Sequence, residues 1–179
     1  MIGAGAVGLA ISCELSSRFS VGLLEKNKTY GLETSSRNSE VIHSGIHYPH
    51  GSLKAQLCVD GNSLLYEFLR ANNLLFKKTG KITIATDEKE VQKIEELYKA
   101  GIENGVPNIK VIAKKDIQKI TPDIEAMAGL YTPSTGIFNV HYLMDCLYKK
   151  FLNNGGIAGL DEKVVGISNK NGLWCVETE

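Results

Sequence analysis

The sequence predicts an α/β fold organised around a dinucleotide-binding unit, and three features at its start predict it. The chain opens with a glycine pattern of the form GxGxxG at Gly3, Gly5 and Gly8, and the apolar residues that follow continue as a helix. A short apolar run, Ser20–Lys26, then ends beside the acidic residue Glu25. A glycine turn that opens a helix, followed by a buried strand, is typical of a parallel sheet that binds a dinucleotide.

Each glycine has its own reason in this interpretation. Gly3 and Gly5 let the backbone turn tightly and approach a pyrophosphate, while Gly8 lets the helix pack closely against its strand. The helix N-terminus offers unpaired N–H groups and a partial positive charge to the phosphates. Glu25 comes about 20 residues after Gly3, where a carboxylate accepts hydrogen bonds from ribose hydroxyls. The alternative for Glu25 is a solvated strand end.

Composition argues against several classes of function. The 179 residues include 20 basic and 20 acidic side chains. This balance argues against nucleic acid as a partner, because binding a phosphate backbone requires a basic surface. No apolar run approaches the roughly 18 residues of a membrane span, and we see no signal peptide. The length suits one large domain or one and a half small ones, and it is enough to bury a sizeable core.

The cysteines and histidines do not have the spacing of a metal site. No CxxC pair occurs, so we expect buried, reduced thiols in a cytoplasmic protein, with association at the periphery of the inner membrane left open. The four cysteines are Cys13, Cys58, Cys146 and Cys175. The histidines lack partners at zinc-site spacing, so no metal is expected. The four histidines are His43, His47, His50 and His141.

Both ends of the sequence read as cut. A dinucleotide-binding turn requires a preceding strand, yet only Met1 and Ile2 come before Gly3. The far end, Trp174–Glu179, stops inside a predicted strand. We therefore expect a fragment of a longer protein, truncated at both ends.

Hydrophobic periodicity and capping residues predict the remaining elements. A polar stretch, Asn27–Gly51, lacks helical periodicity, and a loop this long in a compact domain is usually functional or disordered. Disorder usually comes with few aromatic residues and high net charge, which does not fit this stretch well, so we expect an ordered loop over a ligand. The predicted helices are Val7 to about Phe19, Leu53–Asn72, a helix capped by Asp87 and ended at Gly105–Pro107, Lys114–Ile120, and a helix from Asn139 to Asn154. The predicted strands are Ser20–Lys26, Gly80–Thr86, Ile109–Ala113, and a hairpin of Val164–Ile167 with Leu173–Val176. The segment Gly129–Tyr131 leads into a turn-rich stretch.

Three helices carry an apolar stripe that should face the core. The first stripe is Leu57, Gly61, Leu64, Leu65 and Phe68. The second is Val91, Ile94, Leu97 and Ile102. The third is Val140, Leu143, Met144, Leu147 and Phe151.

Together these segments resemble the FAD-dependent oxidoreductases of the D-amino-acid-oxidase superfamily. The loop Glu33–Pro49, followed by Gly51–Ala55, is similar more narrowly to the L-2-hydroxyglutarate oxidase/dehydrogenase family. Further segments with the same pattern are Leu57–Gly61, Gly80–Ile82, Ala85–Thr86 and Pro133–Ile137. The chain departs from this pattern at Asn139 and His141, and it lacks the C-terminal segment that completes the flavin site in full-length members.

The resemblance implies a Rossmann-like FAD-binding domain (GxGxxG) interleaved with part of a mixed α+β substrate domain. Residues 1–79 would begin the FAD-binding domain, 80–138 would belong to the substrate domain, and 139–179 would return to the FAD-binding domain. The implied reaction is oxidation of a small 2-hydroxy acid, most closely L-2-hydroxyglutarate to 2-oxoglutarate, by hydride transfer to flavin N5. Oxygen or a quinone-linked acceptor would take the electrons.

The long loop supplies a candidate catalytic residue. Oxidation at C2 requires the hydroxyl proton to leave, and imidazole is a suitable base. His43 stands in Ile-His-Ser-Gly, similar to a stretch that lies against the isoalloxazine in related dehydrogenases, so we expect it to line the flavin as base or covalent attachment. The alternative is a histidine that hydrogen-bonds within the loop. His47 and Tyr48 are candidates for the substrate side, with packing as their alternative.

Other residues are expected to contact the cofactor. Arg37 has donors for the pyrophosphate or a substrate carboxylate, the alternative being a salt bridge to Glu33 or Glu40. Neutral donors in the loop suit phosphate or ribityl oxygens, and by the resemblance the backbone near Val164 meets the adenine. The expected cofactor set is Gly3, Gly5, Gly8, Glu25, Lys26, Ser35, Ser36, Arg37, Asn38 and Val164.

Three alternatives remain open at this point. NAD is the alternative cofactor, although in nicotinamide dehydrogenases the acidic residue at the strand end is not usually followed by a loop rich in Ser, Arg and Asn. Another member of the superfamily would act on an amino acid or glycerol 3-phosphate. The third alternative is an inactive, truncated remnant.

Overall fold

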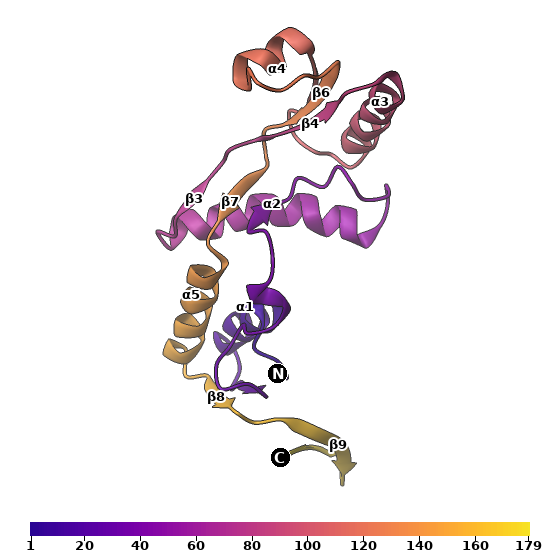
Figure 1. The fold of residues 1–179 in the computed structure, drawn as a ribbon. Helices are drawn as coiled ribbons and strands as arrows, with labels where there is room; N and C mark the ends of the chain where they lie inside the picture. The colour runs from indigo at the N-terminus through magenta and orange to yellow at the C-terminus, as the bar shows by residue number, and fades with distance from the viewer. The chain divides into compact units, whose positions relative to one another are not determined.

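A computed structural model describes residues 1–179, which divide into two compact units (Figure 1). Unit 1 comprises Met1–Ser39 and Asn139–Glu179, and unit 2 comprises Glu40–Phe138. The boundary before Asn139 coincides with the expected return to the first domain. The other boundary follows residue 39, whereas our expected division followed residue 79, so residues 40–79 belong to compact unit 2. The assignment of cofactor and substrate domains stays a prediction.

Unit 1 contains a small parallel sheet next to the glycine turn. Strand β1 (Gly22–Glu25) pairs in parallel with β8 (Ile157–Leu160), which the sequence analysis missed. Ile2 forms a parallel bridge with Leu24 of β1. The Gly3 N–H also donates to the Leu24 carbonyl at 2.8 Å. The few residues before the glycine turn therefore lie beside β1, as the strand before such a turn should.

Two helices, α1 (Ala6–Ser16) and α5 (Val140–Asn153), pack against each other in unit 1 (Figure 1). The predicted cap of α5 is confirmed, because the Tyr142 N–H donates to Asn139 Oδ1 at 3.0 Å. Four of the five residues in its predicted stripe are buried. These are Val140, Met144, Leu147 and Phe151.

The predicted hairpin at the end of unit 1 is confirmed and is longer than expected. Strand β9 (Val164–Lys170) pairs antiparallel with β10 (Leu173–Thr178). Asn171 and Gly172 between them both have positive φ, 55° and 84°. A two-residue turn with this backbone matches the twist of the flanking strands, which explains the Asn-Gly sequence.

Unit 2 contains a three-stranded antiparallel sheet in the order β4–β6–β5. Its strands and flanking helices are β4 (Lys81–Ala85), α3 (Glu88–Glu103), β5 (Lys110–Ala113), α4 (Lys114–Ile120) and β6 (Ala128–Thr132). Four of the five were predicted from the sequence, and β6 was not. Asp87 caps α3 as expected, since its Oδ1 accepts from the Glu90 N–H at 2.8 Å.

The two helices pack on opposite faces of this sheet. Leu130 of β6 belongs to a buried cluster with Ile94 of α3. A side chain at the preceding residue, Gly129, would meet Ile117 of α4 at 3.1 Å. Because neighbouring residues of a strand point to opposite faces, α3 and α4 cover different sides of β6. Ile102, assigned to the α3 stripe from sequence, is instead exposed.

A second antiparallel sheet in unit 2 has the order β2–β7–β3 and was not predicted. Its strands are β2 (Val41–Ile42), β7 (Gly136–Phe138) and β3 (Phe76–Lys77). Each has only two or three residues, too few to show a hydrophobic period. The sheet nevertheless joins the long loop to the turn after β6, because β2 and β7 pair directly. A short 3₁₀ turn, η1 (Thr34–Ser36), lies in unit 1.

Helix α2 (Leu53–Ala71) lies where it was predicted, but its predicted stripe is wrong. Leu57 and Leu64 are more than 60% exposed, and the buried residues lie on another face. Those buried residues are Ala55, Asn62, Tyr66 and Leu69. The error has a physical reason. The spacing of the leucines predicted one buried face, whereas the face that is buried carries Asn62 and Tyr66, which donate hydrogen bonds to backbone carbonyls of unit 2.

The cysteines also differ from expectation. All four thiols are free, as predicted, but each is half-buried rather than buried. Three of the cysteines lie on helices and are partly buried there: Cys13, Cys58 and Cys146. None of the helices combines the length and apolar character needed to cross a membrane.

The cap of α5 allows a direct test. We expect Asn139→Ala to lower the free energy of unfolding by about 1 kcal/mol, because the Tyr142 N–H loses its acceptor. Asn139→Asp is the matched control, since a carboxylate keeps the cap and suits the positive end of the helix. Urea unfolding followed by circular dichroism measures both. Equal stability of the Ala and Asp variants would contradict the assignment.

Candidate functional site

The glycine turn has the close packing that its sequence pattern predicts. Gly3 has a φ of +91°, a conformation that other residues rarely adopt. A Cβ at Gly8 would overlap the carbonyl oxygen of Gly3, so the first turn of α1 can lie on the loop only with glycine at this position. A Cβ at Gly5 would lie 3.0 Å from Ser35 Oγ. The turn thus presents bare backbone at the start of a helix, as a phosphate site requires.

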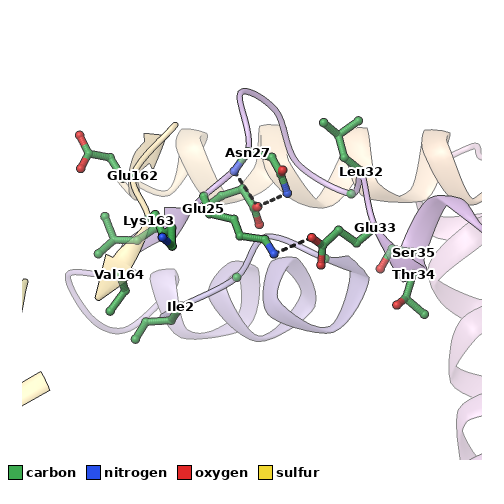
Figure 2. Close-up of a pocket in the computed structure, with 15 residues that line it drawn as sticks. Ile2, Glu25, Asn27, Leu32, Glu33, Thr34, Ser35, Glu162, Lys163 and Val164 are labelled. Carbon is green, nitrogen blue, oxygen red and sulfur yellow. Dashed lines mark hydrogen bonds and ion pairs between the residues drawn. The ribbon is translucent and has the colours of Figure 1, made fainter. Parts of the chain in front are cut away.

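Glu25 fixes the glycine turn to the end of β1. Its Oε2 accepts a hydrogen bond from the Ala4 N–H at 2.7 Å. Its Oε1 accepts from the Asn27 N–H at 3.0 Å and from Asn27 Nδ2 at 2.7 Å (Figure 2). Glu25 is only 7% exposed, so it is not the solvated strand end that we considered as the alternative. Its contact with a ribose stays a prediction.

A pocket of about 390 Å³ opens beside these groups (Figure 2). Four segments of unit 1 line it: the glycine turn, the end of β1, the following loop and the residues that lead into β9. Of the expected cofactor set, the lining residues are Gly3, Gly5, Glu25, Lys26, Ser35 and Val164. The structure therefore brings together residues that lie more than 130 positions apart in the sequence.

An ion pair lies among the side chains that line the pocket. Lys26 Nζ and Glu33 Oε1 are 2.6 Å apart (Figure 2). This hydrogen bond and the opposite charges raise the pKa of Lys26 and lower that of Glu33. Glu33 thus forms its ion pair with Lys26. Arg37, considered as a partner of Glu33, has an exposed side chain and does not line the pocket.

The polar residues of the loop are used in two ways. Ser35 Oγ accepts from the Ala6 N–H at 2.9 Å, so it satisfies one of the donors at the start of α1. Ser36 Oγ instead donates to the Glu33 carbonyl, and Asn38 Nδ2 donates to the Ser35 carbonyl. Only Ser35 of this trio lines the pocket.

Several lining residues were missed from the sequence. They are Ile2, Leu24, Asn27, Gly31, Leu32, Glu33, Thr34, Glu162 and Lys163. Glu162 and Lys163 reach the site because β8 pairs with β1, and the chain after β8 then hydrogen-bonds to the chain after β1. The Asp161 N–H donates to the Asn27 carbonyl and the Glu162 N–H to the Glu25 carbonyl, each at 2.9 Å. Nothing in the local sequence signals this pairing.

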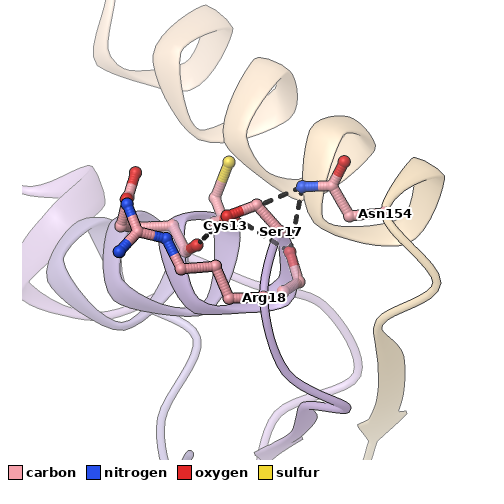
Figure 3. Close-up of polar contacts among 6 residues, drawn as sticks. Cys13, Ser17, Arg18 and Asn154 are labelled. Carbon is pink, nitrogen blue, oxygen red and sulfur yellow. Dashed lines mark hydrogen bonds and ion pairs between the residues drawn. The ribbon is translucent and has the colours of Figure 1, made fainter.

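The far end of α1 is also anchored. Asn154, after the end of α5, donates through Nδ2 to Ser16 Oγ at 3.1 Å and to the Cys13 carbonyl at 3.4 Å (Figure 3). These bonds join the C-terminal ends of the two helices. Because α1 is held here and at Ser35, the N–H groups at its start have a fixed direction.

In unit 2, the loop that carries His43 is fixed through its backbone. The buried Asn62 of α2 donates through Nδ2 to the carbonyls of His43 and Ser134, at 2.9 and 3.0 Å. Tyr66 donates to the same Ser134 carbonyl at 3.0 Å. The His43 residue is itself exposed. Asn62 was not singled out from the sequence, although its spacing of four residues from Tyr66 was a usable signal.

The same loop holds His47 and Tyr48. Asn104, at the end of α3, donates to the carbonyls of Gly45 and Tyr48 at 3.2 and 2.9 Å. The Lys54 ammonium lies 4.6 Å from the centre of the Tyr48 ring. The loop is therefore ordered, as predicted, and it is tied to two helices. Its expected position over a ligand stays a prediction. The roles of His43, His47 and Tyr48 toward a ligand stay predictions.

The Glu25 hydrogen bonds predict a measurable loss. In Glu25→Gln, one carboxylate oxygen is replaced by an NH₂ group, which then faces an N–H donor instead of accepting from it. We therefore expect the free energy of unfolding to fall by about 1–3 kcal/mol and the dinucleotide to bind more weakly. Urea unfolding and quenching of flavin fluorescence measure the two effects. Glu14→Gln is the control, because it removes only an exposed pair with Arg18 and should change stability by less than about 1 kcal/mol. Indistinguishable variants would refute the role of Glu25.

Comparison with solved structures finds the same fold in FAD-binding and amino-acid-oxidising proteins. L-alpha-glycerophosphate oxidase from Mycoplasma pneumoniae, with FAD bound, superposes with a TM-score of 0.93 at 27% sequence identity. The matched region covers 99% of this chain and 48% of the oxidase chain. Glycine oxidase from Geobacillus kaustophilus superposes with a TM-score of 0.83 at 22% sequence identity, and the match covers 99% of this chain and 50% of the oxidase chain. At this low identity, the similarity to glycine oxidase shows a shared fold alone.

Curated relatives are closer in sequence. The mitochondrial L-2-hydroxyglutarate dehydrogenase of Homo sapiens is 36% identical over 170 residues, 93% of this chain and 37% of that protein. The Dictyostelium discoideum protein of the same name is 43% identical over 144 residues, 78% and 32% of the two chains. This chain thus spans about a third of the length of these relatives. The family described as "DAO: FAD dependent oxidoreductase" matches residues 1–179, and the chain therefore belongs to this family.

Proposed function

We propose that this chain is the FAD-binding part, with a portion of the substrate side, of an enzyme that oxidises L-2-hydroxyglutarate to 2-oxoglutarate. The observation that carries the proposal is the similarity to dehydrogenases named for this substrate, at 36–43% identity over most of the chain. The family itself is FAD dependent. The pocket beside the glycine turn supports the same cofactor.

The residues of unit 1 fit the adenosine diphosphate half of FAD. The bare backbone at Gly3 and Gly5 and the start of α1 suit the paired phosphates. Glu25 accepts three N–H groups, and two carboxylate oxygens offer about four acceptor sites, so about one site on Oε2 is left for a ribose hydroxyl. Lys26 and the start of β9 at Val164 line the remaining wall. Ser36, Arg37 and Asn38 are proposed to contact the phosphate or ribityl part.

Bound FAD supplies a hydride acceptor at flavin N5. The protein must then hold the substrate and accept its hydroxyl proton. We assign the proton to the exposed imidazole of His43, whose loop is fixed by the hydrogen bond from Asn62 to the His43 carbonyl. A fixed backbone with an accessible ring suits a general base, because proton transfer requires reach within hydrogen-bond distance. Oxygen or a quinone-linked compound would be the electron acceptor.

One alternative substrate has a specific observation behind it. The solved structure with a TM-score of 0.93 is an oxidase named for L-alpha-glycerophosphate. Glycerol 3-phosphate is therefore the second candidate, and both substrates are small anions that carry a hydroxyl on the carbon to be oxidised.

Anaerobic reduction of the flavin distinguishes these candidates. We expect L-2-hydroxyglutarate to bleach the flavin absorbance of the FAD-loaded protein, and D-2-hydroxyglutarate, glycerol 3-phosphate and glycine to leave it unchanged. Stopped-flow absorbance measures the rate. Bleaching by glycerol 3-phosphate alone would replace the proposed substrate with the alternative, and a protein that binds no flavin would refute the proposal altogether.

The role of His43 is tested in the same assay. We expect His43→Asn to lower the rate of flavin reduction by about 10²- to 10⁴-fold, the usual contribution of a general base. His141→Gln is the control, because this exposed histidine lies on α5 in unit 1. A His43→Asn protein that is reduced as fast as the control would show that the imidazole has no part in the reaction.

A further inference from the structure

A lysine and a histidine from distant parts of unit 2 meet outside the pocket described above. Lys81 Nζ lies 3.3 Å from His47 Nε2. Both residues keep exposed surface, so a small solute can reach them. The partner of this ammonium is thus an imidazole rather than a carboxylate.

The backbone holds both residues in place. Lys81 is the first residue of β4 and pairs with Thr132 of β6, whose hydroxyl also donates to the Lys81 carbonyl at 3.2 Å. His47 follows the fully buried Ile46 and precedes the carbonyl of Tyr48 that Asn104 binds. The two side chains therefore project from rigid segments, as a binding site requires.

The contact sets a condition on the protonation of the pair. An ammonium can only donate, so the hydrogen bond at 3.3 Å requires His47 Nε2 to accept, as it does in a neutral ring with its proton on Nδ1. Loss of hydration lowers the pKa of His47, and electrostatic interactions with Lys81 and His43 lower it further. From α3, Lys93 and Glu96 line the same surface depression as His47.

We propose that Lys81 and His47 together bind the carboxylate that a dicarboxylic substrate carries at the end away from its hydroxyl-bearing carbon. This inference rests on the proposed function and names the group that recognises the substrate. An entering carboxylate accepts from the Lys81 ammonium and from His47, which takes up a proton to become a second donor. Charge-assisted bonds of this kind are the strong ones.

The position along the loop assigns this carboxylate to C5 of 2-hydroxyglutarate. His43, the group proposed to act at C2, lies four residues before His47 and close enough to affect its charge. The C1 carboxylate is bonded directly to C2, whereas C5 lies three carbons from C2. A separate site beside His43 therefore suits the distant carboxylate, and it would favour a dicarboxylate over a monocarboxylate.

The proposal predicts how binding depends on pH. The free His47 is neutral at pH 7, because its pKa lies below the ordinary value of about 6.5. A bound carboxylate raises this pKa, so binding takes up a proton. Affinity for glutarate, the non-reacting analogue, should therefore increase as the pH falls from about 8 to 6, by up to about tenfold per pH unit between the two pKa values.

The experiment uses the FAD-loaded protein and two probes, glutarate and pentanoate, which differ at one end by a carboxylate. Perturbation of flavin absorbance gives both affinities, and calorimetry in buffers of different ionisation enthalpy gives proton uptake. We expect Lys81→Met to weaken the binding of glutarate at least about tenfold and the binding of pentanoate by less than about twofold. We expect His47→Phe to remove the proton uptake and flatten the pH dependence.

Lys110→Met is the matched control, because Lys110 also begins a strand of the same sheet and lies over the Tyr131 ring. It should bind both probes as the parent protein does. The carboxylate site is overturned if Lys81→Met binds glutarate as tightly as the parent protein does, or if its affinities for glutarate and pentanoate fall by the same factor. Reduction of the flavin by L-2-hydroxyglutarate is measured separately, so a failed substrate assignment is distinguished from a failed carboxylate site.

Discussion

The carboxylate of Glu25 forms the interactions on which the pocket beside the glycine turn depends. It receives the Ala4 N–H on one oxygen and two donors of Asn27 on the other, and it is almost fully buried. A buried carboxylate is stable only when its oxygens are hydrogen-bonded. The glycine turn, the end of β1 and the start of the long loop therefore hold one another in place, and the pocket lies between them.

Unit 2 uses the same physical device with neutral groups. The amide of Asn62 and the hydroxyl of Tyr66 bind carbonyls of the long loop and of the turn after β6. Gly136 is required there, because a Cβ would overlap the Tyr66 hydroxyl. Irregular segments have backbone groups that no strand or helix satisfies, so buried polar side chains must do so. This explains why the exposed ring of His43 lies on an ordered segment.

The sequence was most informative where a single residue type has one local use. Asp87 and Asn139 were predicted as helix caps, and their side chains accept the expected N–H groups. The Asn-Gly turn of the hairpin and the helix Lys114–Ile120 also match. Predictions failed where burial depends on a distant partner: the stripe on α2 followed the leucines, and Leu57 and Leu64 are exposed. The burial of cysteines was overestimated for the same reason.

The sequence by itself determined the glycine turn, the acidic end of the second strand, most helices and strands, and the family to which the chain belongs. Local propensity and spacing carry that information. Only the tertiary structure decided that β8 pairs with β1, which brings residues 162–164 to the pocket, and that Lys81 meets His47. These contacts join segments far apart in the chain, so they depend on packing that no short stretch of sequence encodes.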